Sequence, residues 1–166
     1  MRYFLRTLGL FIVFMLPALA AEPEDDAAQM IQDKFVDYHA GDWDAWKSKY
    51  ADDAKVFYNS ADTSMTVDEA VAGHAQSIVP LSHYGFYDEE TRITVILDEN
   101  GNMWAHFNGV WRATFSSTGE TIAVPTAVEY LFAGGKIVEE RGYWNNQIMI
   151  GPYTRAAKAS ATESTE

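Results

Sequence analysis

Strand-like sequence dominates the second half of the chain and limits the folds that it can adopt. Four stretches are rich in β-branched and aromatic residues, namely residues 91–97, 103–115, 121–132 and 137–144. Short turn sequences separate them, among them Asn100-Gly101 and Gly134-Gly135, which suit hairpins because glycine accepts the positive φ of tight turns. Long strands joined by successive hairpins predict an antiparallel sheet with strong curvature.

The first half has the periodicity of helices. Its first apolar stripe has spacings of three and four residues and consists of Ala28, Ile31, Phe35 and Tyr38. Gly41 ends this stripe, and Asp42 suits the N-cap of a second, short helix. Thr66 with Glu69 has the spacing of a capping box for a third helix, which Pro80 ends. Helices followed by a run of hairpins predict an α+β fold.

The first twenty residues have the pattern of a secretory signal peptide. Arg2 and Arg6 precede an apolar run over residues 8–19, and Ala18-Leu19-Ala20 forms a cleavage site. The run is too short to span a bilayer as a helix, although an uncleaved anchor is the alternative. We therefore expect a signal peptide at 1–20, a polar lead-in at 21–26, one domain at 27–152 and a disordered tail at 153–166.

The charge and the cysteine content exclude several classes of function. Without the signal peptide the chain holds 10 basic and 24 acidic residues, a net charge of −14. Such a protein repels nucleic acid and anionic membranes. The absence of cysteine excludes thiol catalysis and cysteine-ligated metal sites. We expect an exported protein, periplasmic or secreted, with no stable membrane anchoring after cleavage.

Four motifs in a fixed order resemble SnoaL-like proteins of the NTF2-like superfamily. They are "AGDWDAW" with "YADDA", "TVDEAVAGH", "WAHFNGVWRATF" and "VPTAVEYLFAGGKIVEERGYWN". The resemblance implies a cone of about four to six antiparallel strands, closed by about three N-terminal helices around a deep pocket. It also implies a homodimer. Members of the family include polyketide cyclases, isomerases and epoxide hydrolases, so the fold implies a pocket rather than one reaction.

Glu140 is the leading candidate for proton transfer. Strand alternation places it on the same face as Trp144, and a carboxylate in an apolar pocket is a stronger base than in water. The alternatives are a solvated Glu140 or an ion pair with Arg112. In the resembled family an acidic residue follows the last strand, where this chain has Asn145, so that family's carboxylate chemistry does not carry over at this position.

His74, on the third predicted helix, is the second catalytic candidate, as a base or as a hydrogen-bond donor. A core histidine is the alternative. The residues that we expect to bind the ligand are Tyr130, Asn145, Trp144, Trp111, His106 and Ile78. His106 falls on the mixed face of its strand, and it reaches the pocket only if a bulge at Gly109 reverses the alternation.

The motifs of other chemistries are absent. The chain has no nucleophile elbow, no phosphate-binding glycine loop and no H-E-x-x-H zinc motif. We expect no metal and no cofactor. The hypothesis is therefore an exported protein that binds a small, mostly apolar or amphipathic molecule, with acid–base activity of the isomerase, cyclase or hydrolase type. The alternatives are a non-catalytic binding protein and a dimeric scaffold.

Overall fold

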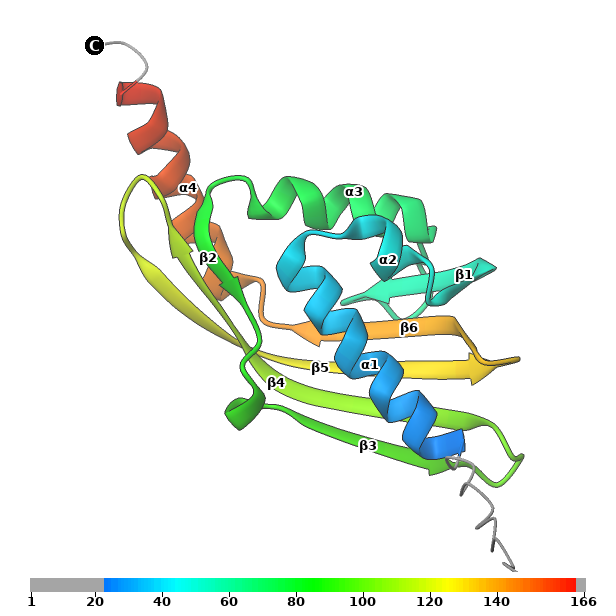
Figure 1. Cartoon of the computed structure of the whole chain (residues 1–166). Helices are drawn as coiled ribbons and strands as arrows, with labels where there is room; N and C mark the ends of the chain where they lie inside the picture. The colour runs from blue at the N-terminus through cyan, green and yellow to red at the C-terminus, as the bar shows by residue number, and fades with distance from the viewer. Residues whose placement is uncertain (1–22, 164–166) are drawn as a thin grey trace, which may run out of the picture.

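A curved six-stranded sheet carries helices on its concave side in the computed structural model, which describes residues 23–163 (Figure 1). The elements, in chain order, are α1 (Pro23–Ala40), α2 (Trp43–Lys47), β1 (Tyr50–Tyr58), α3 (Val67–Ile78), β2 (Leu81–Gly85), the 3-10 helix η1 (Asp88–Glu90), β3 (Arg92–Leu97), β4 (Met103–Phe115), β5 (Thr121–Ala133), β6 (Lys136–Trp144) and α4 (Gln147–Glu163). The predicted signal peptide lies outside the described residues.

The sheet closes into a half-cone because β4 changes its partner along its length. The strand order is β1-β6-β5-β4, and β4 then pairs with β3 along its first half and with β2 along its second half. The helices α1, α2 and α3 lie across the hollow of this sheet (Figure 1). The predicted α+β cone is therefore confirmed.

One strand pairing differs from the prediction of a purely antiparallel sheet. Strand β1 runs parallel to β6, with Tyr58 opposite Gly142. The two strands are separated by most of the domain, and a long connection allows parallel pairing. The sheet is therefore mixed.

The helix starts follow the predicted capping chemistry. The Oδ1 atom of Asp42 accepts a hydrogen bond of 3.0 Å from the backbone N–H of Ala45 at the start of α2. Thr66 and Glu69 form the reciprocal capping box at the start of α3. These caps satisfy N–H groups that have no partner inside a helix.

Two segments that were predicted to be irregular are helical. Helix α1 begins at Pro23 within the predicted lead-in, because proline suits the first turn of a helix and the acidic residues after it complement the helix dipole. Residues 153–163 of the predicted disordered tail are part of α4, and the rest of that tail lies outside the described residues. Tertiary contacts hold that helix: the Tyr153 ring packs edge-on against Phe115 at 4.9 Å, and Ala156 is buried. None of the helices between residues 23 and 163 is long and apolar enough to cross a membrane.

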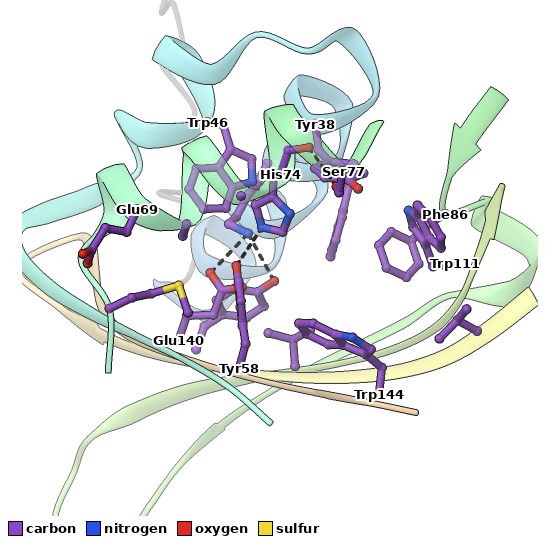
Figure 2. A pocket seen from close by; sticks show the side chains of 18 of the residues that line it. Tyr38, Trp46, Tyr58, Glu69, His74, Ser77, Phe86, Trp111, Glu140 and Trp144 are labelled. Carbon is purple, nitrogen blue, oxygen red and sulfur yellow. Dashed lines mark hydrogen bonds and ion pairs between the residues drawn. The ribbon is translucent and has the colours of Figure 1, made fainter. Parts of the chain in front are cut away.

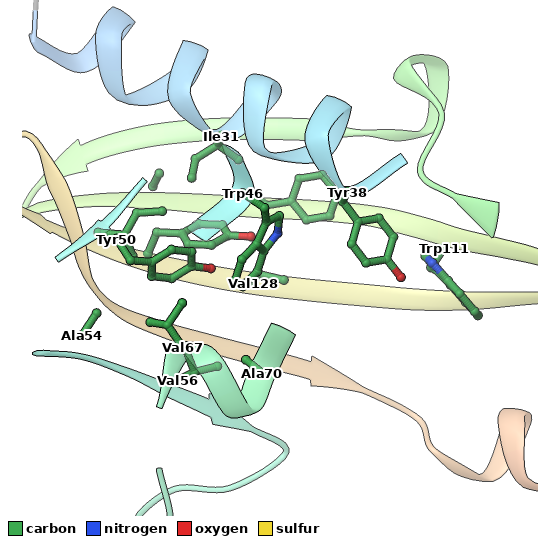
Figure 3. Close-up of a cluster of buried hydrophobic side chains, with 14 of the residues drawn as sticks. Ile31, Tyr38, Trp46, Tyr50, Ala54, Val56, Val67, Ala70, Trp111 and Val128 are labelled. Carbon is green, nitrogen blue, oxygen red and sulfur yellow. The ribbon is translucent and has the colours of Figure 1, made fainter. Parts of the chain in front are cut away.

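The apolar core fills the space between the helices and the concave face of the sheet (Figure 3). Alternation along β4 and β5 follows the predicted pattern, with the predicted apolar face of each strand turned to the core. Trp46 and Tyr130 are among the largest fully buried side chains. Side chains from the strands and side chains from the helices therefore surround the same interior.

Gly85, at the end of β2, is the glycine whose replacement we expect to be most damaging. Its φ is +141°, and an added Cβ would lie 1.5 Å from Nε2 of His39. That Nε2 accepts a 2.8 Å hydrogen bond from the backbone N–H of Phe86, so the ring has little freedom to move. We expect Gly85→Ala to lower the free energy of unfolding by about 2–3 kcal/mol, measured by urea denaturation.

Gly101→Ala provides the matched control for this substitution. Gly101 also has a positive φ, of +78°, but no atom lies within 4 Å of its added Cβ. Gly101→Ala should lower the free energy of unfolding by about 1 kcal/mol, from backbone strain alone. Equal losses in the two variants would contradict the close packing of His39 on Gly85.

Candidate functional site

A pocket of about 390 Å³ opens between the helices and the concave face of the sheet (Figure 2). Its walls are mostly apolar and aromatic and include Phe35, Trp46, Phe86, Trp111 and Trp144. Lining residues on α3, such as Glu69 and Gly73, are exposed and mark the mouth. Its volume and its walls are typical of a site for a small molecule.

A group of polar side chains lies at the buried end of this pocket, and we call Lys34, Tyr50, Tyr58, Tyr130 and Glu140 the buried polar cluster. The Nζ atom of Lys34 lies 3.4 Å from Oε2 of Glu140, and the two side chains are only 3% and 4% exposed. The Tyr50 hydroxyl donates to the same Oε2, and the Tyr58 hydroxyl lies 3.2 Å from Oε1. Both oxygens of the carboxylate are therefore engaged.

Aromatic rings surround the amine of Lys34. Its Nζ lies 4.2 Å from the ring centroid of Trp46 and 5.0 Å from that of Tyr130. It also lies 3.4 Å from the Tyr130 hydroxyl, which accepts a hydrogen bond. Burial lowers the pKa of the Lys34 amine, and the charge of Glu140 opposes this effect without cancelling it.

The tyrosine hydroxyls of the cluster stay protonated. Burial, and next the negative charge of Glu140, raise the pKa values of Tyr50, Tyr58 and Tyr130 well above the ordinary value. These phenols are therefore hydrogen-bond donors at every physiological pH. The cluster combines one cation, one carboxylate and three neutral donors.

His74 extends the cluster toward α3. Its Nε2 lies 2.8 Å from the Tyr58 hydroxyl, and its ring stacks on Trp43 with centroids 6.2 Å apart. Burial, followed by the charge of Lys34, lowers the pKa of His74 to about 3. The imidazole is therefore neutral near pH 7. Tyr58 has one proton, so it donates either to Glu140 or to His74.

A second polar group lies in the wall that β4 contributes. The Nε1 atom of Trp111 is buried and has no hydrogen-bond partner of normal geometry among the described residues. The Tyr38 hydroxyl points toward this indole (Figure 3), and burial raises the pKa of Tyr38 although the indole opposes this effect. A buried N–H without a partner is costly, so this group suits a ligand acceptor.

The comparisons with known proteins identify the family. A sequence model described as "SnoaL-like domain" matches residues 32–140, about two thirds of the chain. The chain belongs to the SnoaL-like domain family. A search of curated proteins found no matching sequence.

Solved structures show the same fold at low sequence identity. A candidate polyketide cyclase from Xanthomonas campestris pv. campestris is 20% identical, with a TM-score of 0.62 over 78% of this chain and 98% of that chain. A candidate isomerase from Bacillus subtilis is 14% identical, with a TM-score of 0.59 over 81% and 96%.

A protein from Catenulispora acidiphila with a ketosteroid isomerase-like fold, in complex with trimethylamine, is 12% identical. Its TM-score is 0.57, over 74% of this chain and 90% of that chain. The family and its cone fold support a cofactor-independent role in binding small molecules.

Five of the eight predicted site residues of this SnoaL-like domain line the pocket. They come from α3 and from three strands: His74, Trp111, Tyr130, Glu140 and Trp144. Glu140 and Trp144 share one face of β6, as the alternation predicted. Arg112 pairs with Glu90 at 2.5 Å instead of with Glu140.

The other three predicted residues lie elsewhere in the SnoaL-like domain. His106 is on the outer face of the sheet, 3.6 Å from Glu129, because the register of β4 with β5 is continuous and no bulge occurs at Gly109. Asn145 is exposed and its Oδ1 accepts from the N–H of Gln147 at the start of α4. Ile78 ends α3 outside the pocket lining, where Ser77 is the last lining residue of that helix.

Sequence reasoning missed Lys34, Tyr50 and Tyr58. A signal for Lys34 was present, because it lies on α1 three residues after Ile31 and four before Tyr38, within the apolar stripe. A lysine on such a stripe needs a buried partner. No group of three or more metal-binding side chains occurs within the described part of the chain.

Proposed function

We propose that this SnoaL-like domain binds a small, mostly apolar molecule that carries a carbonyl or hydroxyl group, and that it performs acid–base chemistry on this molecule without a cofactor. The reaction would be of the isomerase, cyclase or hydrolase type. One observation carries the proposal: a buried ion pair with three tyrosine hydroxyls lies at the closed end of an otherwise apolar pocket.

A buried ion pair is weak evidence for a role in stability. Removing two charges from water is expensive, and well-packed apolar residues of similar size often serve stability as well or better. Groups with strongly perturbed pKa values inside a pocket mark functional sites. Lys34, Tyr58 and His74 all meet this description and all line the same pocket.

In this proposal each polar side chain of the pocket has a role. Glu140 accepts a proton from the ligand or returns it, and Tyr58 links Glu140 to His74. The neutral His74 orients the Tyr58 hydroxyl. Tyr130 and the Trp111 N–H hold the polar groups of the ligand, and Trp144 packs against its apolar part.

A non-catalytic binding protein is the second candidate function. It is favoured by the three donors on Glu140, since an engaged carboxylate is less free to take a proton from a ligand. We also propose, from the sequence, that the protein is exported and acts as a homodimer. A scaffold role would require neither the pocket nor the buried polar cluster.

The proposal predicts binding that depends on the pocket. A screen of small apolar ketones and alcohols by thermal shift and native mass spectrometry should identify binders. Trp144→Ala should weaken the best binder about 10- to 100-fold, because a packed aromatic wall contributes about 1.5–3 kcal/mol. Trp104→Ala is the control, because Trp104 is absent from the pocket lining and its Nε1 contacts Asp98.

Hydrogen exchange separates the two candidate functions. In deuterated buffer, an acid–base enzyme should exchange the protons next to the carbonyl of a bound ketone, and Tyr58→Phe should slow this exchange at least 10-fold. Binding without protein-dependent exchange would support the non-catalytic function. If no ketone or alcohol raises the melting temperature of the protein or is found bound by native mass spectrometry, the proposal of a small-molecule site in the pocket is wrong.

A further inference from the structure

We propose that Lys34 is a nucleophile, whose ε-amine forms an imine with an aldehyde or ketone held in the pocket, with Glu140 transferring the protons. This inference rests on the proposed function, because it concerns the same pocket and a carbonyl ligand. It adds a covalent step and restricts the ligand class to aldehydes and ketones.

The position of the amine is the first argument. Lys34 is one of the residues that line the pocket, and its side chain is only 3% exposed, so the amine is shielded from bulk solvent. Lys47 and Lys49 instead form ion pairs nearer the surface, with Asp68 and Asp37. A desolvated lysine in an apolar pocket is the usual environment of an amine nucleophile.

The aromatic surroundings are the second argument. The rings of Trp46 and Tyr130 lie 4.2 and 5.0 Å from Nζ and exclude water from it. A ligand that fills the pocket would remove the remaining water. Exclusion of water disfavours separated charges, so the proton of the ammonium moves to Glu140, whose Oε2 is 3.4 Å away. The products are a neutral amine and a carboxylic acid.

The chemistry balances with the groups present. The lone pair of Nζ attacks the carbonyl carbon and forms the C–N bond, and the carbonyl oxygen takes the proton of the Glu140 carboxyl. The nitrogen then returns a proton to the Glu140 carboxylate, which protonates the hydroxyl of the carbinolamine. The C–O bond breaks and water leaves. The neutral amine, the carbonyl and the Glu140 carboxylic acid have become a protonated imine, water and the Glu140 carboxylate, with no oxidant or reductant.

An imine at this place would serve the proposed reaction types. In its protonated form it draws electrons from the neighbouring carbon and makes the C–H bonds there more acidic. Glu140 lies 3.4 Å from Lys34 and is placed to accept such a proton. Proton transfer next to the former carbonyl is the step that an isomerase or cyclase needs.

A 1,3-diketone tests the inference directly. 1-Phenyl-1,3-butanedione condenses with a neutral lysine amine, loses one water and gives a stable enaminone that absorbs in the near ultraviolet. The wild-type protein should gain the mass of one diketone less one water, and peptide mapping should place the adduct on Lys34. No adduct, or adducts confined to exposed lysines, would overturn the inference.

Paired variants and a binding measurement complete the test. Lys34→Met with Glu140→Gln removes the amine without leaving a buried charge, and it should lose the adduct. Lys49→Arg, which keeps its pairing with Asp37, should form the adduct like the wild type. Quenching of tryptophan fluorescence by the diketone without any adduct would reject the imine and leave the proposed function standing.

Discussion

Glu140→Gln should lower the free energy of unfolding by about 3–5 kcal/mol, because it leaves the Lys34 ammonium buried without its counter-charge. The Lys34 side chain is 3% exposed, so little water can reach it in place of the lost carboxylate. Urea denaturation followed by tryptophan fluorescence at pH 7 measures the loss. The loss should shrink as the pH rises, because deprotonation of Lys34 relieves the variant.

A double variant separates the charge effect from packing. Lys34→Met with Glu140→Gln has no buried charge. The amide oxygen of glutamine accepts from one of the two tyrosine hydroxyls, and its NH2 group donates to the oxygen of the other. We expect it to recover most of the stability lost in Glu140→Gln, to within about 1 kcal/mol of the wild type. Recovery would show that the ion pair is retained for the site and not for stability.

The outer face of the sheet offers a matched control. Glu129→Gln makes the same substitution on the neighbouring strand, where Glu129 is 41% exposed and faces His106. We expect a change within about 0.5 kcal/mol, as for most exposed pairs. If Glu140→Gln lowered the free energy of unfolding by no more than Glu129→Gln does, Lys34 and Glu140 would be hydrated in solution, contrary to the structure.

The faces of the strands could be predicted from the sequence because side chains alternate with a fixed period of two. Once the apolar face of a strand is recognised, geometry places every second residue with it. Trp111, Tyr130 and Glu140 lie on the strand faces to which alternation assigned them, and in the structure these faces line the pocket. The caps at Asp42 and Thr66 were predictable for a similar reason, because capping depends on atoms only two or three residues apart.

The partner of Glu140 could not be found in this way. Lys34 is on α1 and Glu140 on β6, and only the packing of α1 across the sheet brings them to 3.4 Å. The spacing of residues within one helix or one strand contains no information on that distance. The parallel pairing of β1 with β6 and the packing of Tyr153 on Phe115 were missed for the same reason.

Acid should destabilise the domain from about pH 6.5 downward, in part through His74. Burial lowers its pKa from 6.5 to about 3 in the folded state. Between these values the unfolded chain binds a proton that the folded chain does not. Stability therefore falls as the pH falls, by about 1.4 kcal/mol per pH unit from this group alone, or about 2 kcal/mol at pH 5.

The physical reason is the environment of the ring. The imidazole packs edge-on against Trp46 at 5.5 Å and against Tyr38 at 5.4 Å, with the charge of Lys34 nearby. A positive imidazolium there would lose its hydration and would meet a like charge. The Tyr58 hydroxyl offers it only one neutral partner, at 2.8 Å.

Comparison with a variant isolates this contribution from the titration of the carboxylates. His74→Gln cannot titrate, and its amide can still hydrogen-bond Tyr58. The difference in unfolding free energy between wild type and His74→Gln, measured by urea denaturation, should therefore move by about 2 kcal/mol from pH 7 to pH 5, with the wild type losing more. His106→Gln, on the outer face of the sheet, should move by less than about 0.5 kcal/mol over the same range. Parallel pH profiles for wild type and His74→Gln would show that His74 is hydrated in solution, and it would then be open to act as a base near neutral pH.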